Sequence, residues 1–552
     1  MANKIIMPNG TIAVEAEYRR QLITEYKGNP FTEALTPLLS SEEVAEKIAV
    51  YPNYSVQERL LDKQYRIHLT QRLFQFFQPL TRHLDLESRI SRVIYQGYLA
   101  RNPFNPEYIK SLQDGVNVIQ NSNNEISSNS DFRTTGAGFS IVGPSGVGKS
   151  VSLNRVLSSI YPQVIIHKKY TGYNFSMYQV TWIKLECPYN GSLRGLALQF
   201  FSAVDRLLSS DFYKKFSTGR RTVDSLLISM IQVARSIGLG VLIIDEIQHL
   251  SNCKGVEKST LLSYVVTLQN SIGIPIILVS TPKGLPILQS EFRQARRGSG
   301  QGDFLWDRLK KDEEWDLLIQ GLWNYQWTRR EIQLNNSLAD AIYEECQGII
   351  DLAVKLYVMS QIVAITNGTE TVTPELIRQV ADKHLQLVKP MVQALKSGNI
   401  QQIAKYEDIC TVDIDFVSFM NRERTSVDLQ MKIEAIKKTQ QKKEQEIQLS
   451  VKEQAILKLI ELKIEAETAQ AAVEKVITEK DGLDVNEAVI KAIQSISTSD
   501  KRERKSRKAE VSMNNDLRVI VAEGRKEYKT AYEMLKEKGF IKSYENDFYK
   551  VG

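Results

Sequence analysis

The feature that most constrains this chain is the stretch "GFSIVGPSGVGKSVSLNR", residues 138–155. A short apolar run, typical of a buried strand, leads into a glycine-rich turn and then into a segment with helical spacing. The turn, from Gly143 to Ser150, matches the pattern GxxxxGK[ST] at every fixed position. Because its glycines let backbone N–H groups face inward and a helix N-terminus follows, the motif predicts a phosphate-binding loop in an α/β fold.

The expected ligand of this loop is ATP with Mg²⁺. Lys149 is expected to reach the β- and γ-phosphates, and the Ser150 hydroxyl to ligate the metal ion. The alternative is a fortuitous glycine-rich turn, and the strand before and the helix after the loop argue against it. The residues expected to hold the nucleotide are Gly143, Pro144, Ser145, Gly146, Val147, Gly148, Lys149, Ser150 and Val151.

A second element is the acidic pair at the end of "GVLIIDE", residues 240–246. Four apolar residues predict a buried strand, and Asp245 and Glu246 follow at its carboxyl end, where open α/β sheets bind ligands. We expect Asp245 to hold Mg²⁺ through water, and Glu246 to act as a general base or to orient the water that attacks the γ-phosphate. Acidic pairs at strand ends are common by chance, but a pair that follows a phosphate loop on so apolar a strand is not.

A third element is the segment "IPIILVSTPKG", residues 274–284. Another apolar strand ends in Ser280 and Thr281, whose hydroxyls are able to orient the attacking water or to sense the γ-phosphate. Thr281 is equally suited to cap the next helix, with Pro282 at the first helical position. The two roles are compatible.

A cluster of arginines follows in "FRQARRG", residues 292–298. Arg293, Arg296 and Arg297 are expected at the end of a helix, before a glycine-rich loop. An arginine presented across a subunit interface is able to neutralise transition-state charge in a neighbouring site. A solvated basic helix end, favoured by the helix dipole, explains the cluster equally well.

The order of apolar segments predicts an α/β core followed by a helical region. From residue 138 to about 330, continuous apolar strands alternate with helices, which indicates a parallel sheet covered on both faces. Strands are expected at 178–187, 240–246 and 274–281, and helices at 85–102, 193–208 and 223–238. Residues 335–390 have helical patterns only, including a helix with Thr373 as its N-cap and Pro374 in its first position.

These patterns divide the chain into four expected parts. They are an N-terminal extension of short helices and connectors (1–84), an α/β core (85–330), an all-helical lid (331–400) and a charged helical C-terminal region (401–552). Within the last part, residues 428–480 favour a helical hairpin or an extended charged helix over a long coiled coil.

Composition bounds the class of protein. The chain of 552 residues has four scattered cysteines without a CxxC pair, which fits a reducing cytoplasm and gives no zinc site or disulfide framework. We expect neither a membrane span nor an export signal, because no apolar run has the required length. The net charge of +6 permits nucleic-acid binding without arguing for it. The run "KRERKSRK", residues 501–508, is either a solvated linker or a flexible arm that touches DNA phosphates.

The ordered set of phosphate loop, acidic strand end, polar strand end, arginine cluster and helical lid resembles the AAA+ ATPases of the initiator-like branch. Further segments, among them "RVIYQGYLARNP", "NGSLRGLALQFFSAVDR", "VLIIDEIQHLS" and "RQARRGSG", resemble the TnsC family, the regulator ATPases of Tn-seven-type transposons and their CRISPR-guided relatives. The resemblance covers residues 29–400 and returns weakly near "LKEKGFIKSYENDFYK".

The resemblance implies a DNA-bound protein that connects two other proteins. Members of this family bind ATP and assemble on double-stranded DNA as rings or helical filaments, with about six or seven subunits per ring or turn. They connect a TnsD/TniQ-type target selector to a TnsA/TnsB-type transposase, which the C-terminal tail commonly engages. The N-terminal extension is expected to contact the selector or another partner, and ATP hydrolysis to time assembly and disassembly.

The resemblance also assigns roles by motif match. The two principal nucleotide motifs place Lys149, Ser150, Asp245 and Glu246 in the site. The first sensor corresponds to Ser280 or Thr281. The trans-acting arginine corresponds to Arg296 or Arg297. One departure concerns the lid. Many AAA+ lids carry a basic sensor three residues after a helix-start glycine, and here Asp351 stands in that position after Gly348. Either lid closure depends less on the γ-phosphate, or Lys355 substitutes for the missing base.

Two other functions are compatible with an ATPase core. A motor or helicase-loader-type ATPase would need loops that grip DNA or protein, and the nearest candidate, "KYTGY" at 169–173, comes too early in the chain. A nucleotide-gated switch without DNA is the other. The basic stretches 213–221 and 252–259 are candidate DNA contacts, although each taken alone is more often an ordinary solvated segment.

Overall fold

A computed structural model describes residues 4–7, 10, 12–106, 108–110, 138–218, 221–252, 273–285, 288 and 302–399, and, beyond residue 400, mainly 433–441, 466–479 and 485–503. The chain divides into two units, residues 1–447 and 448–552. All residues expected to bind nucleotide belong to the first unit.

The centre of the first unit is the expected parallel sheet. Its strands, in spatial order, are β6 (Trp182–Glu186), β7 (Val241–Asp245), β8 (Ile276–Ser280), β3 (Phe139–Val142) and β9 (Phe304–Leu305). Each neighbouring pair is parallel. The carboxyl ends of β3, β7 and β8 therefore meet at one edge, which is where the phosphate loop and the polar strand ends follow.

Helices cover both faces of this sheet. Helices α7 (Leu193–Leu208) and α9 (Val223–Ser236) pack in one buried cluster, and α4 (Thr81–Leu99) and α6 (Lys149–Ile160) in another. Alternate residues of β7 enter the two clusters, with Leu242 and Ile244 on the α7 side and Val241 and Ile243 on the α6 side. This two-sided burial is the reason that the strand is apolar throughout.

The structure contains a second sheet that the sequence analysis did not predict. Strands β1 (Lys4–Ile6), β2 (Ile12–Glu15), β4 (Val164–Tyr170) and β5 (Tyr173–Val180) form it in that order. The prediction of one strand over 178–187 is therefore wrong, because β5 ends at Val180 in this sheet and β6 starts the parallel sheet. The two join at Thr181, whose N–H donates to the Gln163 carbonyl just before β4 (2.9 Å) and whose carbonyl accepts the Val241 N–H of β7 (3.0 Å). The segment 169–173 is the β4–β5 turn.

The N-terminal extension also holds short helices. They are η1 (Thr24–Tyr26), α1 (Pro30–Glu33), α2 (Ser41–Ile48), η2 (Val56–Leu60), α3 (Lys63–Leu69) and η3 (Thr70–Gln75), where η marks a 3-10 helix. The expected boundary between residues 84 and 85 lies inside α4, so the extension runs into the core without a break.

The helical lid is present and starts earlier than expected. It comprises α12 (Glu313–Trp323), α13 (Asn336–Cys346), α14 (Ile350–Asn367), α15 (Pro374–His384) and α16 (Lys389–Ser397). Helix α12 lies before the expected boundary at 331 and shares a buried cluster with the later helices. Helix α15 begins as predicted, because the Thr373 hydroxyl accepts the Leu376 N–H (3.3 Å) and Pro374 follows.

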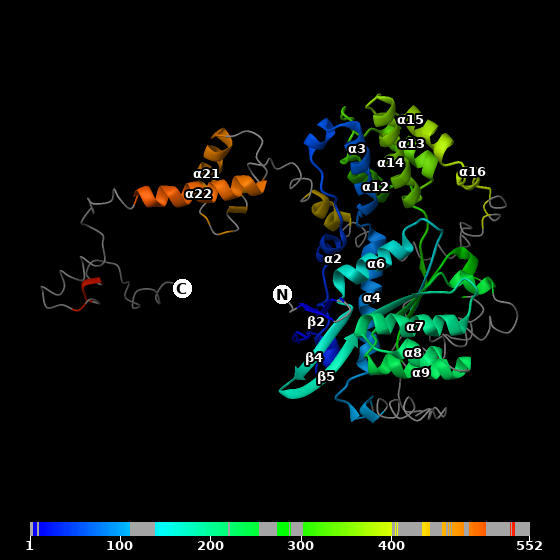
Figure 1. Ribbon diagram of the computed structural model, residues 1–552. Coiled ribbons are helices and arrows are strands. Elements are labelled where there is room, and N and C mark those ends of the chain that lie inside the picture. Colours follow the sequence, from blue (N-terminus) through cyan, green and yellow to red (C-terminus); the bar gives the residue numbers. More distant parts are fainter. Residues whose placement is uncertain are drawn as a thin grey trace, which may run out of the picture. The chain divides into compact units, whose positions relative to one another are not determined.

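Figure 1 shows the lid helices gathered at one end of the first unit, with α7, α8 (Phe212–Ser217) and α9 toward the other. In the described part of the chain, α14 is long and apolar enough to be a candidate membrane span, with a mean hydropathy of 1.2, and half of it is buried inside the lid. A core helix of a globular domain has the same properties.

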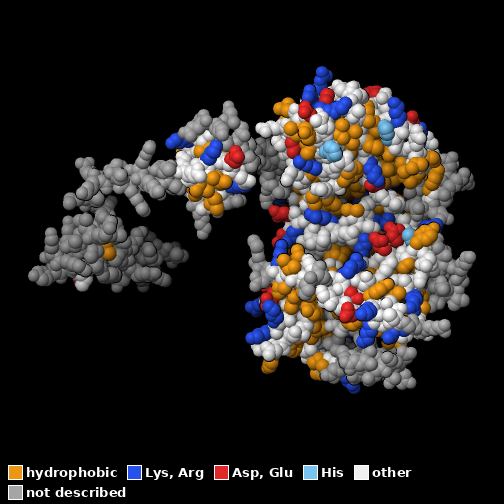
Figure 2. Space-filling view, viewed as in Figure 1, with side chains coloured by type: hydrophobic (Ala, Val, Ile, Leu, Met, Phe, Trp, Pro, Cys, Tyr) orange, Lys and Arg blue, Asp and Glu red, His pale blue; other side chains and the backbone are white. Residues whose placement is uncertain are grey.

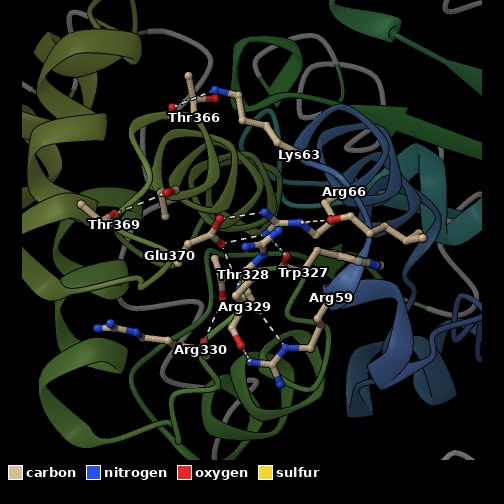
Figure 3. A network of polar contacts seen from close by, with 12 residues as sticks. Arg59, Lys63, Arg66, Trp327, Thr328, Arg329, Arg330, Thr366, Thr369 and Glu370 are labelled. Atoms are coloured by element: carbon tan, nitrogen blue, oxygen red, sulfur yellow. Dashed lines mark hydrogen bonds and ion pairs between the residues drawn. The ribbon is translucent and has the colours of Figure 1, made fainter.

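Polar contacts join the N-terminal extension to the lid, although some 300 residues of chain separate them. The buried Arg66 guanidinium on α3 donates two hydrogen bonds to the Glu370 carboxylate, each 2.7 Å, and one to the Trp327 carbonyl. Arg59 donates to the Thr328 carbonyl (2.8 Å) and pairs with Glu331. Figure 3 shows both arginines pointing toward the lid loop that follows α12 and contains Trp327 and Thr328. The contacts fix the extension against the lid.

The second unit contains a helical hairpin. Helix α21 (Ala466–Glu479) packs along α22 (Val485–Glu503) through alanine and valine side chains. This agrees with one of the two expectations for the charged region, although the hairpin extends beyond residue 480. Only residues 501–503 of the basic run lie in the described part, at the end of α22.

Replacing Arg66 tests the contact between extension and lid. Arg66→Ala leaves the largely buried Glu370 carboxylate without its charged partner and with only the Arg329 N–H as a donor, so we expect a loss of about 3 kcal/mol of stability. The exposed Lys63, which donates to the Thr366 carbonyl, is the matched control, and Lys63→Ala should change stability by less than about 0.5 kcal/mol. Thermal unfolding of the purified variants measures both, and equal midpoints for the two variants would contradict the prediction.

The same contact predicts a pH dependence. The Arg66 hydrogen bonds lower the pKa of Glu370 from its ordinary value of 4.5. A carboxyl whose pKa is lower in the folded state contributes stability above its unfolded pKa and loses it as the pH falls through the folded value. The difference between wild type and Arg66→Ala should therefore be full at pH 7 and shrink below about pH 4.5.

Candidate nucleotide-binding site

The loop between β3 and α6 has a backbone that only glycine adopts easily. Gly146 and Gly148 have φ values of +80° and +93°, in the left-handed region. At Gly143 a Cβ would lie 2.1 Å from the Trp306 carbonyl oxygen. The loop therefore has the wrapped shape that a phosphate cradle needs.

Lys149 is held by the loop itself. Its ammonium donates to the carbonyl oxygens of Gly143 (2.6 Å) and Pro144 (2.7 Å), and the side chain is largely buried. A buried ammonium needs oxygen partners, and phosphate oxygens would serve it as well as carbonyls. The expected role of Lys149 toward the β- and γ-phosphates stays a prediction.

The structure brings the loop and the acidic strand end together as predicted. The Ser150 hydroxyl, in the first turn of α6, donates to Asp245 Oδ2 (2.6 Å). The other Asp245 oxygen accepts the Glu246 N–H (2.9 Å), and Lys184 Nζ lies 2.8 Å from Oδ2. A hydroxyl and a carboxylate side by side are suitable oxygen donors for Mg²⁺.

Ser150 and Asp245 fit a magnesium ion only when a bound nucleotide supplies further oxygen ligands. In the described part of the chain, no three His, Cys, Asp or Glu side chains gather into a metal cluster. Ser150 and Asp245 would hold the ion together with phosphate oxygens and water, which is the usual mode for Mg²⁺ beside a nucleotide. The fit is to a nucleotide-borne ion rather than to a resident metal.

Glu246 adopts a strained backbone at the end of β7. Its φ is +59°, which is rare for a residue other than glycine and is found at functional sites. The carboxylate is 44% exposed and accepts a hydrogen bond from the Gln248 side-chain amide. His249 Nε2 lies 3.9 Å away, and the His249 ring packs edge-on against Tyr189. Gln248 and His249 belong to the 3-10 helix η4 (Ile247–Asn252).

The two hydroxyls at the end of β8 have different surroundings. The Ser280 hydroxyl donates to the Thr281 carbonyl (2.9 Å) and to the Gln248 side-chain oxygen (3.2 Å). The Thr281 hydroxyl is buried without a hydrogen-bond partner, and Thr281 lines the cavity beside the loop. Thr281 also precedes η5 (Pro282–Gly284), with Pro282 in the first position, but its side chain makes no capping bond. A buried hydroxyl without a partner, on a residue that lines a cavity, needs an explanation, and a ligand bound in the cavity would supply one.

Several of these residues line one cavity of about 440 Å³, whereas Asp245, Lys184 and Ser280 are not among its lining residues. The lining residues come from the phosphate loop, from the ends of β6, β7 and β8, and from the lid. They are Ser145, Gly146, Gly148, Lys149, Ser150, Val151, Tyr189, Glu246, Gln248, His249, Thr281, Lys283 and Asp351. Figure 2 shows charged side chains of both signs along the waist between the helical lid and the sheet-containing core. A polar cavity of this size suits a charged ligand.

The lid contacts the loop at Asp351, the position at which the sequence departs from the basic sensor of many AAA+ lids. The Asp351 N–H, in the first turn of α14, donates to the Gly146 carbonyl (3.2 Å). The Asp351 carboxylate forms an ion pair of 2.6 Å with Lys355, which is not among the cavity's lining residues. Gly348 packs against Leu309, whose N–H donates to the Gly348 carbonyl (2.9 Å). The lid thus reaches the nucleotide loop through backbone and an acidic residue.

The arginines expected to act in trans, Arg293, Arg296 and Arg297, lie outside the described residues, as does most of the stretch 252–259. In the stretch 213–221 the Lys215 and Arg221 side chains lie over the Phe216 ring, at 5.7 and 5.1 Å from its centre.

Sequence reasoning missed several residues of the site. Gln248 follows the acidic pair by two positions, but its link to β8 depends on how η4 folds back. Placing Lys184 in the site requires knowledge of the β6–β7 register, in which Lys184 pairs with Ile243. Tyr189 and Lys283 reach the cavity from loops after β6 and β8. The signal that could have found Tyr189 and Lys283 is their position just after predicted strands, because ligands of open α/β sheets bind at the carboxyl ends of the strands.

Comparisons with known proteins agree with this arrangement. The family described as the AAA domain matches residues 133–288. Comparison with curated proteins gives no match.

Solved structures similar to this chain include a Walker-type ATPase of Pyrococcus abyssi, with 13% identity over 61% of this chain and 91% of that chain and a TM-score of 0.31. Cdc6p of Pyrobaculum aerophilum has 13% identity over 63% and 98% of the two chains and a TM-score of 0.31. Drosophila ORC, in a structure bound to DNA, has 12% identity over 56% and 78% and a TM-score of 0.26. With its phosphate loop, parallel sheet and helical lid, the chain has the AAA+ P-loop fold and contains an AAA-type ATPase domain.

Proposed function

We propose that this protein is an ATP-dependent regulator of DNA transposition of the TnsC type, which assembles on double-stranded DNA and links a target selector to a transposase. The observation that carries the ATP-dependent part is the preformed cavity, where the phosphate loop, the acidic strand end and the lid meet. The segments that resemble the TnsC family over residues 29–400 support the transposition role.

The chemistry of the cavity supports hydrolysis of ATP. Lys149 and the loop N–H groups would bind the phosphates, and Ser150 and Asp245 would hold Mg²⁺. The ion would offset negative charge on the phosphates. Glu246 is exposed to the cavity and suited to accept a proton from, or orient, the attacking water. The orphaned hydroxyl makes Thr281, rather than Ser280, the residue that we assign to sense the γ-phosphate.

A switch role is supported by the contacts of the lid. The lid contacts the phosphate loop through Asp351 and the N-terminal extension through Glu370. A change at the loop therefore has a contiguous route to the extension, which we propose as the surface for a TnsD/TniQ-type selector. The C-terminal region is proposed to reach a TnsA/TnsB-type transposase, and an arginine among Arg293, Arg296 and Arg297 to complete the neighbouring subunit's site.

Electron microscopy of the protein with duplex DNA tests this function. Rings or filaments on DNA are expected with a non-hydrolysable ATP analogue, and not with ADP or without nucleotide. Lys149→Ala should abolish both nucleotide binding and assembly, because it removes the ammonium that contacts the phosphates. Lys168→Ala, on the exposed side of β4, is the control and should assemble normally.

Monomers in every condition would contradict the proposal. ATP-driven separation of DNA strands, or ATP-driven unfolding of a protein, would favour the alternative of a motor or loader.

Glu246→Gln separates binding from hydrolysis. The variant keeps the shape and the hydrogen-bonding capacity of the side chain but cannot accept a proton, so hydrolysis should fall by about 10² or more. ATP binding should be retained, and the DNA-bound assembly should last longer than that of wild type. A filament lifetime that does not increase, measured after dilution from excess ATP, would disprove the timer role.

Thr281→Val and Ser280→Ala distinguish the two hydroxyls. Valine matches threonine in shape and removes only the unpartnered hydroxyl, so the rate of ATP hydrolysis should fall by about tenfold or more, while ADP binding stays near wild type. Ser280→Ala breaks a contact that the protein makes with itself, and its effect on the rate should be smaller. The opposite order of effects would move the sensing role to Ser280.

A further inference from the structure

We propose that Lys184 is a counter-ion built into the nucleotide site, which holds the magnesium-binding carboxylate of Asp245 while no nucleotide is bound and gives up that oxygen when a divalent ion arrives with the nucleotide. This inference rests on the proposed function. It makes Lys184 a positioning residue that sets how strongly Mg²⁺ and nucleotide promote each other's binding.

The strand register puts Lys184 in this place. In the parallel pair β6–β7, Lys184 lies beside Ile243, and Glu186 beside Asp245. Residues two apart on a strand share a face, so Lys184 and Asp245 both face the α6 side, where Ile243 is buried. The lysine thus approaches the carboxylate diagonally across the sheet, from the side on which α6 begins.

One carboxylate oxygen receives two donors. Lys184 Nζ lies 2.8 Å from Asp245 Oδ2, and the Ser150 hydroxyl lies 2.6 Å from the same atom. The Asp245 side chain is 3% exposed and that of Lys184 is 14% exposed. At this burial the attraction between the charges is screened far less than on the surface.

Lysines on edge strands are common and usually solvated, and β6 is an edge strand of its sheet. Lys168, on the inner strand β4 of the other sheet, is a solvated lysine of this kind, because it is 58% exposed while paired with Glu15. Lys184 differs from it in burial and in its partner, which is the residue expected to hold the metal. The ammonium occupies the charge-compensating role that a divalent ion would take.

Two consequences follow for binding. Without Mg²⁺, the Lys184 ammonium stays beside Asp245 at the end of the phosphate loop, where its positive charge favours the negatively charged nucleotide. With nucleotide, Mg²⁺ has to displace the ammonium from Oδ2, so the ion strengthens nucleotide binding less than it would without Lys184. The coupling between Mg²⁺ binding and nucleotide binding is measured by one ratio, the nucleotide dissociation constant without Mg²⁺ divided by that with Mg²⁺.

The test measures that ratio with a fluorescent ADP, mant-ADP, on the full chain in EDTA and in excess Mg²⁺. Lys184→Met removes the charge and should raise the ratio by about tenfold, from weaker binding in EDTA and tighter binding in Mg²⁺. Lys184→Arg keeps the charge and should stay near wild type, as should the control Lys168→Met. Thermal unfolding checks that each variant is folded, and Lys184→Gln replaces Lys184→Met if the latter is not.

Asp245→Asn separates the failure of this inference from the failure of the proposed site. If Asp245→Asn lowers the ratio toward one and Lys184→Met leaves it at the wild-type value, the role of Lys184 is overturned and the nucleotide site stands. If Mg²⁺ does not affect mant-ADP binding to wild type, the proposed magnesium site fails, and the inference fails with it. A raised ratio in Lys184→Met and an unchanged one in Lys184→Arg supports the inference.

Discussion

The compensation of one buried carboxylate organises the nucleotide site. Asp245 is almost fully buried at the end of β7, and a buried carboxylate is costly unless donors surround it. Its donors come from three directions: the Ser150 hydroxyl from α6, the Glu246 backbone and the Lys184 ammonium from β6. Because each donor belongs to a different element or position, satisfying Asp245 fixes the phosphate loop, the strand end and the edge strand relative to one another.

Under the proposed function, the groups that would activate water lie around a second polar centre, the Gln248 side chain. The Gln248 side chain donates to the Glu246 carboxylate and accepts from the Thr281 backbone and the Ser280 hydroxyl. A single amide therefore connects the acid that faces the water to the end of β8, where the orphaned Thr281 hydroxyl lies. The left-handed backbone of Glu246 is held between this amide and the Asp245 carboxylate. Under the proposed function, occupation of the γ-phosphate position and the orientation of Glu246 are coupled through Gln248.

The lid connects the cavity to parts of the chain far from the chemistry. Asp351 contacts the phosphate loop, and Glu370, in the loop after the other end of α14, receives the Arg66 side chain of the N-terminal extension. Burial of an arginine–carboxylate pair makes this second contact geometrically strict, because either partner alone would be uncompensated. The first unit thus has a continuous path from nucleotide loop to extension, built from one helix and two polar contacts.

The sequence by itself determined the features that depend on neighbouring residues. Glycine spacing gave the phosphate loop, an apolar run ending in acids gave β7, and Thr373 with Pro374 gave the start of α15, because each is a local rule of backbone conformation or burial. Tertiary structure decided what depends on strand register and on the folding back of loops. The division of 178–187 into two strands, the second sheet, the different surroundings of the Ser280 and Thr281 hydroxyls, and the approach of Lys184 to Asp245 all arise from contacts between residues distant in the chain. No local pattern encodes these contacts, since a one-residue shift of register would turn Lys184 to the opposite face of the sheet.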